Sequence, residues 1–238
     1  MENIALLKKY NVAAPRYTSY PTVPYWEVDN FSQQKYIEAL TANYHQNKQE
    51  GISVYIHLPF CENLCTYCGC NTRITKNHGV EKPYIEAVIK EWDMYCRRLG
   101  EQPKIKELHL GGGTPTFFSA EKLKTLLNAI IGKRQQGDEI ECSFEGHPDN
   151  TTVAHLETLY QFGFKRVSLG IQDFDPKVQL MINRFQTVQQ VQEITQSARA
   201  IGYQSVNFDL IYGLPFQTLT GLAETINEVI NLNLDRIA

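Results

Sequence analysis

Short runs rich in β-branched and aromatic residues alternate with longer segments of helical period along most of the chain after residue 50. The strand-like runs begin at Ser53, Lys106, Glu139, Arg166 and Ser205. Alternation of this kind predicts repeated βα units and a sheet of parallel strands. We therefore expect five such units, and we read LDRIA at 234–238 as the start of a sixth strand.

The segments between these strands carry their apolar residues on one helical face. After Ser119, a candidate N-cap, positions 123, 126, 127, 130 and 131 are all Leu or Ile, which gives one apolar stripe. Similar faces occur in residues 84–99, 153–164, 191–203 and 222–232. Parallel strands with right-handed crossovers curl into an open or closed barrel. The predicted fold class is α/β, a partial (β/α)6 TIM-like barrel that is truncated at the start of the sixth strand.

The first 50 residues have a different character. Residues 12–26, VAAPRYTSYPTVPYW, contain three prolines and four Tyr or Trp rings, a composition that resists both helix and central strand. The amphipathic segment SQQKYIEALTANYHQ at 32–46 predicts a helix. We expect an irregular arm and a helix over residues 1–50, and the barrel-like core over residues 51–238.

Composition narrows the class of protein. With 238 residues, 42% of them hydrophobic and 21% charged, the chain can bury one substantial core. A net charge of -3 does not indicate a nucleic-acid surface. No segment approaches the ~20 apolar residues of a membrane span, and no signal peptide is evident. We expect a cytoplasmic protein with no membrane span and no nucleic-acid partner.

Four of the six cysteines lie within CENLCTYCGC, residues 61–70. In a reducing compartment, clustered cysteines are more often metal ligands or redox groups than disulfides. Structural zinc usually takes paired knuckles from two segments, and no second pair exists, although His57 and His78 could complete a site. The other two cysteines, Cys96 and Cys142, fall in a predicted helix and strand, and we interpret them as buried small apolar residues.

The spacing within the cysteine cluster leaves two further readings. Cys65 and Cys68 match the redox pattern C-x-x-C, but this reading leaves Cys61 unexplained. A C-x3-C-x2-C loop can instead occupy three corners of an iron-sulfur cube. Three protein ligands on a four-iron cluster would leave one iron open to a substrate or cofactor.

Polar or glycine-rich residues follow every predicted strand. The cysteine cluster follows the first, GGGTPT at 111–116 the second, EGHP at 145–148 the third, QDF at 172–174 the fourth and DLIYGLP at 209–215 the fifth. Parallel βα folds bind their ligands at the carboxyl ends of the strands. We therefore expect one site built from these five segments.

These motifs resemble those of the radical S-adenosylmethionine (SAM) superfamily, in the three-cysteine loop and in the glycine-rich GGGTPT. A wider set resembles the oxygen-independent coproporphyrinogen III oxidases: PRYTSYP at 15–21, Tyr55 in VYIHLPF, CGC at 68–70, VSLGIQDF at 167–174, INR at 182–184 and NFDLIYGLP at 207–215. The resemblance runs over nearly the whole chain. Members of that family are nearly twice as long, so we expect an N-terminal portion, whose activity alone the sequence does not decide.

The resemblance implies a [4Fe-4S] cluster held by Cys61, Cys65 and Cys68, with SAM on the open iron. It implies SAM-site positions at Tyr55, Tyr67, Gly112, Gly113, Thr114, Glu145, Gln172, Arg184 and Asp209. We also take Tyr55 as the candidate catalytic side chain. These residue types suit the ligand, because glycines let backbone amides approach closely, carboxylates accept from ammonium or hydroxyl groups, and arginine pairs a carboxylate. Cys70 is near the cluster in the family but is not a ligand.

The implied reaction is the oxidative decarboxylation of two propionates of coproporphyrinogen III to vinyl groups, which gives protoporphyrinogen IX in haem biosynthesis. The reduced cluster would pass one electron to SAM, and the 5'-deoxyadenosyl radical that results would remove a hydrogen from a propionate. Loss of CO2 and of one further electron would then leave the vinyl group. The implied partners are the tetrapyrrole and an electron donor such as a flavodoxin or ferredoxin, and we expect a monomer. Arg16, in the aromatic arm, is our candidate partner for a propionate.

Two positions depart from the pattern of the resembled family. Many members carry Asp-Pro after the third-strand glutamate, where this chain has Gly146-His147-Pro148, and an acidic residue is common where this chain has Phe185. The alternatives are another radical SAM enzyme of tetrapyrroles, such as an anaerobic haem-degrading methyltransferase, or a haem-binding chaperone relative. The CGC and PRYTSYP motifs favour the oxidase.

Overall fold

The structure is a computed structural model that describes residues 2–11, 22–132 and 139–238. It divides into two compact units, Met1–Asn43 and Tyr44–Ala238. The predicted boundary between residues 50 and 51 stays a prediction. Arg16 and most of the aromatic arm lie outside the described residues. No helix in the described ranges is long and apolar enough to cross a membrane.

The N-terminal segment is helical where it is described. Helix α1 covers Glu2–Tyr10, and single 3-10 turns cover Val23–Tyr25 and Val28–Asn30. Helix α2, Gln33–Gln46, confirms the helix predicted at 32–46. Helix α1 was not predicted, because its two leucines give only a short apolar face.

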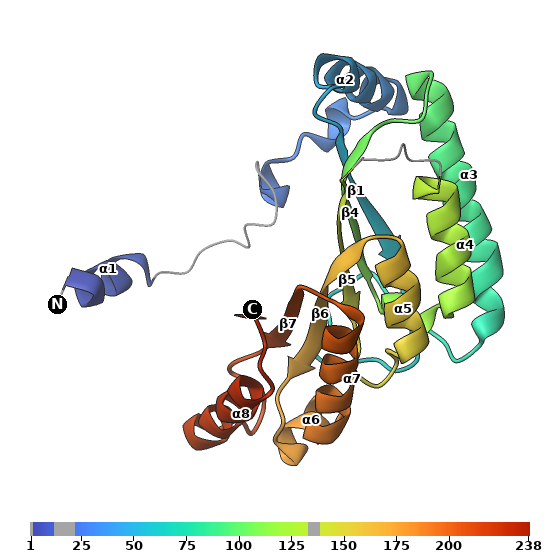
Figure 1. The fold of residues 1–238 in the computed structure, drawn as a ribbon. Coiled ribbons are helices and arrows are strands. Elements are labelled where there is room, and N and C mark those ends of the chain that lie inside the picture. The colour runs from blue at the N-terminus through green and yellow to red at the C-terminus, as the bar shows by residue number, and fades with distance from the viewer. Residues whose placement is uncertain (1, 12–21, 133–138) are drawn as a thin grey trace. The chain divides into compact units, whose positions relative to one another are not determined.

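Within the described residues, six strands form one parallel sheet (Figure 1). Each strand pairs with the next in chain order, in parallel. The strands are β1 (Ile52–Leu58), β4 (Ile105–Gly112), β5 (Glu141–Gly146), β6 (Phe164–Gln172), β7 (Ser205–Leu210) and β8 (Arg236–Ile237). This order is that of an α/β barrel wall, so the predicted fold class is confirmed, including the sixth strand.

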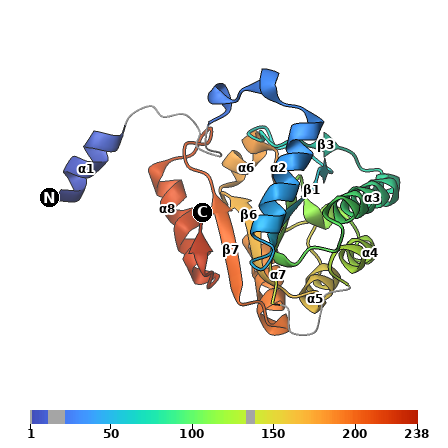
Figure 2. The same cartoon turned by 90° about the horizontal axis from the view of Figure 1, so that it is seen from above.

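Helices follow the strands and line one face of the sheet. They are α3 (Glu81–Leu99), α4 (Ala120–Ile131), α5 (Val153–Gln161), α6 (Pro176–Ile182), α7 (Val188–Ile201) and α8 (Leu219–Asn231). Figure 2 shows α3, α4, α5 and α7 side by side along that face. All five predicted helices are present, and α6 is additional. Asp175 is the N-cap of α6, and its carboxylate accepts from the backbone amides of Lys177 and Val178.

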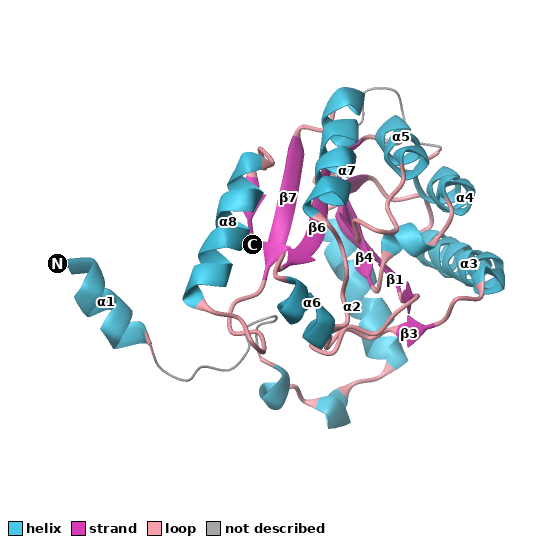
Figure 3. Cartoon of the chain, turned by 90° about the horizontal axis from the view of Figure 1, so that it is seen from below, coloured by secondary structure: helices cyan, strands magenta, loops and turns pink. Residues whose placement is uncertain are grey.

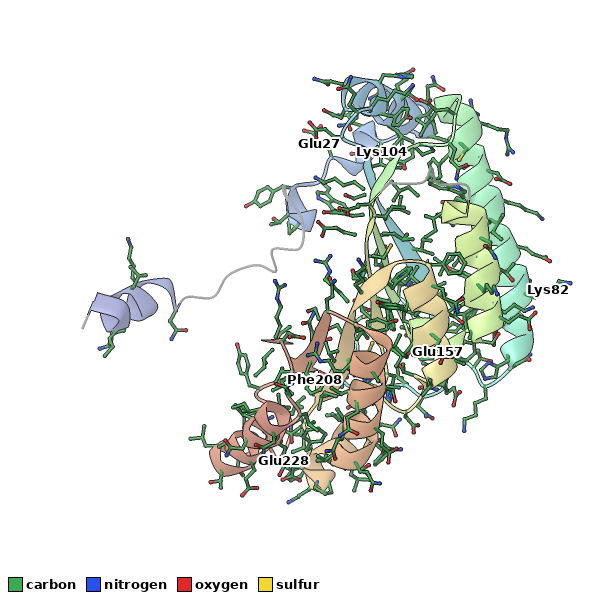
Figure 4. The ribbon with its side chains drawn as sticks, viewed as in Figure 1. Glu27, Lys82, Lys104, Glu157, Phe208 and Glu228 are labelled. Carbon is green, nitrogen blue, oxygen red and sulfur yellow. The ribbon has the colours of Figure 1, made fainter. Side chains whose placement is uncertain are left out.

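The core lies between the sheet and these helices. Strand residues such as Leu110, Phe144 and Phe208 are fully buried there, together with the predicted α4 stripe. Figure 4 shows Phe208 within β7, whereas Glu157 and Glu228 project from helices α5 and α8. Because side chains alternate along a strand, the other face of the sheet carries polar residues. That polar face and the carboxyl ends of the strands, viewed in Figure 3, hold the candidate site.

Ser119 occupies the predicted N-cap of α4, but its side chain does not cap that helix. Its hydroxyl and its backbone amide instead donate to Glu81 Oε2, at 2.9 and 3.0 Å. Glu81 is only 4% exposed, and its Oε1 lies 2.6 Å from Nδ1 of His78. A buried carboxylate therefore ties the beginnings of α3 and α4 together.

Candidate functional site

A cavity of about 220 Å³ opens at the carboxyl ends of the strands. The three predicted cluster cysteines line it, and so do eight further predicted positions: Tyr67, Gly112, Gly113, Thr114, Glu145, Gln172, Arg184 and Asp209. These residues come from the ends of β1, β4, β5, β6 and β7 and from the turn after α6. The structure therefore brings segments that are up to about 150 residues apart in the sequence to one place, as expected of a βα fold.

The cysteine loop is closed at its base by a second, two-stranded sheet. Strand β2 (Phe60–Cys61) pairs in parallel with β3 (Arg73–Ile74). The amide of Arg73 donates to the carbonyl of Pro59 at 2.8 Å, and that of Thr75 donates to the carbonyl of Cys61 at 2.9 Å. The loop of residues 61–74 is thus held at both ends next to β1.

The tip of the cysteine loop is fixed to the end of α6. The amide of Thr66 donates to the carbonyl of Ile182 at 3.1 Å, and its hydroxyl donates to that of Met181 at 3.0 Å. In the other direction, Asn183 Nδ2 donates to the carbonyl of Leu64 at 2.8 Å. Asn183 has a left-handed backbone, with φ 52°, and ends α6. The sequence placed Asn183 in a family motif but did not reveal this contact.

The three predicted cluster cysteines form one electrostatic group. Burial raises the pKa of Cys61, a hydrogen bond with the hydroxyl of Thr114 at 3.3 Å opposes this, and the nearby Cys68 and Cys65 raise the pKa further. Arg184 Nη1 lies 3.7 Å from Sγ of Cys65. None of the cysteines forms a disulfide.

The three thiols of the loop suit separate corners of an iron-sulfur cube. Among the described residues, no three His, Cys, Asp or Glu side chains are grouped closely enough to hold one metal ion. A cube of iron and sulfur binds its thiolates at separate corners, so it does not need that convergence. Cys61, Cys65 and Cys68 share one loop and one cavity, which is the arrangement that the cube requires. Cys70 lines the same cavity, and its pKa is raised by burial and by Cys68.

The glycine-rich segment serves close packing in this structure. The amides of Gly113 and Thr114 already donate to the carbonyls of Leu58 and Phe60, at 2.9 and 3.0 Å. A Cβ at Gly113 would lie 2.7 Å from the carbonyl of Pro59. The amides of Gly113 and Thr114 are therefore engaged within the chain, and a role of these two positions in SAM binding stays a prediction. Their segment has to pass directly against the chain that carries Cys61.

Two carboxylates face the cavity as hydrogen-bond acceptors. Glu145 accepts from the amide of Gly112 at 3.4 Å and lies 3.5 Å from Nε2 of His109. Asp209 accepts from the hydroxyl of Ser168 at 2.9 Å. Burial raises the pKa of Asp209, while the Ser168 hydrogen bond opposes the shift. Both groups can accept from the ammonium or hydroxyl groups of a polar ligand.

Tyr55 lies on the polar face of β1, beside the cavity and not among its lining residues. Its hydroxyl is 3.0 Å from Nδ1 of His57, and its ring stacks on His109 with 5.8 Å between centroids. His57 Nε2 lies 2.7 Å from the carbonyl of Asn71, which can only accept. His57 Nδ1 is therefore unprotonated when the ring is neutral, and the Tyr55 hydroxyl donates to it. A catalytic role for Tyr55 stays a prediction.

Tyr67 packs against a small apolar cluster and also lines the cavity. Its ring packs against the small apolar cluster of Val178, Ile182 and Leu214. Burial raises the pKa of its hydroxyl, the Arg184 cation opposes this, and a hydrogen bond with Cys65 raises it further. Tyr67 therefore fills the loop core as well as facing the cavity.

Arg184 is hydrogen-bonded to the backbone of β6. Its Nε and Nη2 both donate to the carbonyl of Gly170, at 3.2 and 2.5 Å. A Cβ at Gly170 would lie 2.6 Å from Nη2 of Arg184 and 2.8 Å from Nε2 of Gln172. Gln172 has a left-handed backbone, with φ 67°, where the register between β6 and β7 shifts. The sequence did not identify Gly170, although its place in GIQDF was visible.

Both residues that depart from the resembled family also line the cavity. His147 follows β5 directly, and Phe185 follows Arg184 with its side chain 54% exposed. The sequence showed only that these two positions differ from the pattern of the resembled family. Their place in the cavity follows from the strand ends that carry them.

Residues 55–229 match the family model described as the Radical SAM superfamily. Curated relatives named oxygen-independent coproporphyrinogen III oxidase include one from Pseudomonas aeruginosa, 39% identical over 98% of this chain and 50% of the relative. Another, from Escherichia coli, is 37% identical over 99% of this chain and 50% of the relative. The chain thus spans about half the length of these relatives, and the resemblance expected from the motifs is confirmed.

Solved structures show the same relationship. The coproporphyrinogen III oxidase HemN from Escherichia coli, described as a radical SAM enzyme, superposes with a TM-score of 0.85 at 35% identity, over 99% of this chain and 51% of that one. The radical SAM methyltransferase TsrM from Kitasatospora setae matches 81% of this chain and 37% of its own, with a TM-score of 0.54. At 13% identity, this second likeness shows the fold alone.

Proposed function

This chain belongs to the Radical SAM superfamily, whose cofactors are a [4Fe-4S] cluster and SAM, and we propose that it is the cluster-binding and SAM-binding portion of an oxygen-independent coproporphyrinogen III oxidase. One observation carries the proposal. Three cysteines and eight further positions expected from the family's motifs line a single cavity at the strand ends. The P. aeruginosa relative at 39% identity supports the choice of activity within the superfamily.

Cys61, Cys65 and Cys68 would hold the cluster, and each must lose its proton to do so. The guanidinium of Arg184 lies within hydrogen-bonding distance of the Cys65 sulfur, with 3.7 Å between Nη1 and Sγ. At Cys61, burial outweighs the hydroxyl of Thr114 and raises the pKa, so cluster binding releases protons at neutral pH. The loop that carries the three cysteines is hydrogen-bonded to β3 and to the end of α6.

The other lining residues would position SAM. When bound, the cluster and SAM supply a carbon-centred radical that can remove hydrogen from an unactivated C–H bond. Glu145 and Asp209 offer carboxylate acceptors, and Arg184 offers a fixed cation close to Cys65. Leu64 and Phe185 line the cavity with more than half of their side chains exposed, and they can shield the reacting groups from water.

The proposed substrate is coproporphyrinogen III, whose two reacting propionates become vinyl groups. The cited relatives carry that activity in their names. Arg16 remains our candidate partner for a propionate and lies outside the described residues. An electron donor such as a flavodoxin or ferredoxin, a monomeric state and a cytoplasmic location complete the proposal.

Product analysis tests the proposed activity. The chain is reconstituted anaerobically with iron and sulfide and then incubated with SAM, a reductant and either coproporphyrinogen III or haem. Protoporphyrinogen IX and two equivalents of CO2 are expected from coproporphyrinogen, and haem is expected to stay unchanged. Conversion of haem would indicate the methyltransferase alternative, and stable haem binding without decarboxylation would indicate the chaperone relative.

A further inference from the structure

His147 lies in a rigid turn at the edge of the cavity. It directly follows β5, two residues after Glu145. Its carbonyl accepts from the amides of Asn150 and Thr151 at 3.0 and 2.9 Å, and from the hydroxyl of Thr151 at 2.8 Å. The turn leaves the imidazole among the lining residues of the cavity.

The hydrogen bonds of the ring determine which nitrogen carries the proton. The backbone amide of Asp149 donates to Nδ1 of His147 at 3.1 Å. An amide nitrogen can only donate, so Nδ1 is the acceptor and the neutral ring carries its proton on Nε2. Within the described part of the chain, no group accepts a hydrogen bond from Nε2. His147 therefore offers one unused N–H donor at the cavity.

The surroundings keep this ring neutral. Burial and then the nearby cation of Arg184 lower the pKa of His147 to about 3. Two carboxylates beside its turn have hydrogen-bond partners of their own. Asp149 accepts from Gln190 at 3.4 Å, and Glu62 accepts from Asn150 at 3.2 Å. At neutral pH, a neutral N–H donor and a fixed guanidinium thus line the same cavity. Two such donors suit a negatively charged acceptor.

We propose that His147 binds the cofactor directly, by donating its Nε2–H to the carboxylate of SAM next to Arg184. This inference rests on the proposed function, since it places SAM in the cavity. In the family members with Asp-Pro here, an ionised aspartate could accept a hydrogen bond but could not donate one. This chain thus uses a different donor set for the same ligand.

Two matched variants distinguish the effect of losing the Nε2–H donor from the effect of losing the hydrogen bond within the turn. His147→Asn keeps an oxygen that can accept from the Asp149 amide but lacks a donor at the Nε2 position. His147→Gln has a longer side chain whose amide nitrogen reaches approximately as far as Nε2 and can still donate. One hydrogen bond contributes roughly 0.5–1.5 kcal/mol, which corresponds to about a 2-fold to 10-fold change in affinity.

The readout is the dissociation constant of SAM and of decarboxylated SAM, measured by calorimetry on the anaerobically reconstituted chain. His147→Asn is expected to weaken SAM binding about 2-fold to 10-fold and to leave decarboxylated SAM unaffected, whereas His147→Gln stays within about 2-fold of the parent for both. The iron content without SAM is expected to be the same in all three proteins, and His147→Asn is expected to keep the melting temperature of the parent.

A second, ligand-free readout is the ring nitrogen spectrum of His147, which is expected to show protonated Nε2 and no titration between pH 5 and 8. Equal weakening of both ligands in His147→Asn, no weakening of either, or a ring that titrates near pH 6.5 would overturn the inference alone. No SAM binding by the unaltered chain would overturn the proposed function with it.

Discussion

At the scale of single residues, Gly170 has no side chain at a point where the side chains of Arg184 and Gln172 lie close to its backbone. At Gly170 an added methyl group would fall on the ends of the Arg184 and Gln172 side chains, which can move. We therefore expect Gly170→Ala to fold with a loss of no more than about 1 kcal/mol in unfolding free energy and to weaken SAM binding about 10-fold. Denaturant unfolding and calorimetric SAM titration measure the two effects.

Gly69→Ala is the matched control for Gly170→Ala. Gly69 lies between Cys68 and Cys70, and an added Cβ there meets nothing within 4 Å. Gly69→Ala should therefore keep the dissociation constant of SAM within about 2-fold of that of the parent protein. Equal weakening by both variants would mean that displacement of Arg184 is not the cause.

His147 is also expected to make the folded chain less stable as the pH falls. Its ordinary pKa of 6.5 applies to the unfolded chain, and the folded pKa is about 3. Between these values the unfolded chain binds the proton and the folded chain does not, so stability falls as the pH falls. The contribution is at most about 1.4 kcal/mol per pH unit.

Urea unfolding between pH 4 and 7 measures this contribution as the difference between the parent chain and His147→Gln. The parent is expected to lose stability faster than the variant below pH 6.5. Parallel pH profiles for the two proteins would contradict the assignment of a neutral His147.

At this scale the sequence predicted the residue types that carry chemistry but not how they are held. Spacing and position at strand ends were enough to select Cys61, Glu145 and Asp209. The proton position on His147 depends on the amide of Asp149 and on the charge of Arg184, which is 37 residues away in the chain. Such contacts exist only after folding, so no local pattern indicates them.

Among the elements, the contact between the cysteine loop and the end of α6 has the clearest consequence. Asn183 combines a left-handed backbone with a side chain that donates to Leu64 in the loop. Asn183→Gly retains that backbone and removes the bond, at a cost of about 1 kcal/mol. We expect a chelator to remove the reconstituted cluster faster from Asn183→Gly than from the parent chain. The decay of the cluster's visible absorbance measures this loss.

Asn233→Gly provides the matched control for this experiment. Asn233 also has a left-handed backbone, with φ 56°, but it lies after α8, and only its main-chain atoms make hydrogen bonds with described residues. Cluster loss from Asn233→Gly should therefore match the parent. Faster loss from both variants would show that backbone freedom alone, and not the bond to Leu64, explains the effect.

The elements themselves followed from the sequence where their periodicity was long. The stripe at Leu123, Leu126 and Ile130 predicted α4, and all three residues are buried. Helix α6 has only seven residues, too few for two full turns of an apolar stripe, and was missed. Its Asp175-Pro176 start was a local signal that could have revealed it.

At the scale of the whole molecule, the chain spans about half of the length of its named relatives. It nevertheless carries all three cysteines that are expected to bind the cluster. The order of strands could be predicted, because alternating βα units leave few topologies. The test of the central claim therefore concerns the cavity in this chain alone.

That test is the iron content of the anaerobically reconstituted chain together with its reductive cleavage of SAM. We predict about four irons per chain and formation of 5'-deoxyadenosine. Cys61→Ala, Cys65→Ala and Cys68→Ala should each lose both, whereas Cys96→Ser, in α3 and outside the cavity, should retain both. Bound zinc without iron, or full iron and SAM cleavage in any of the three alanine variants, would contradict the account.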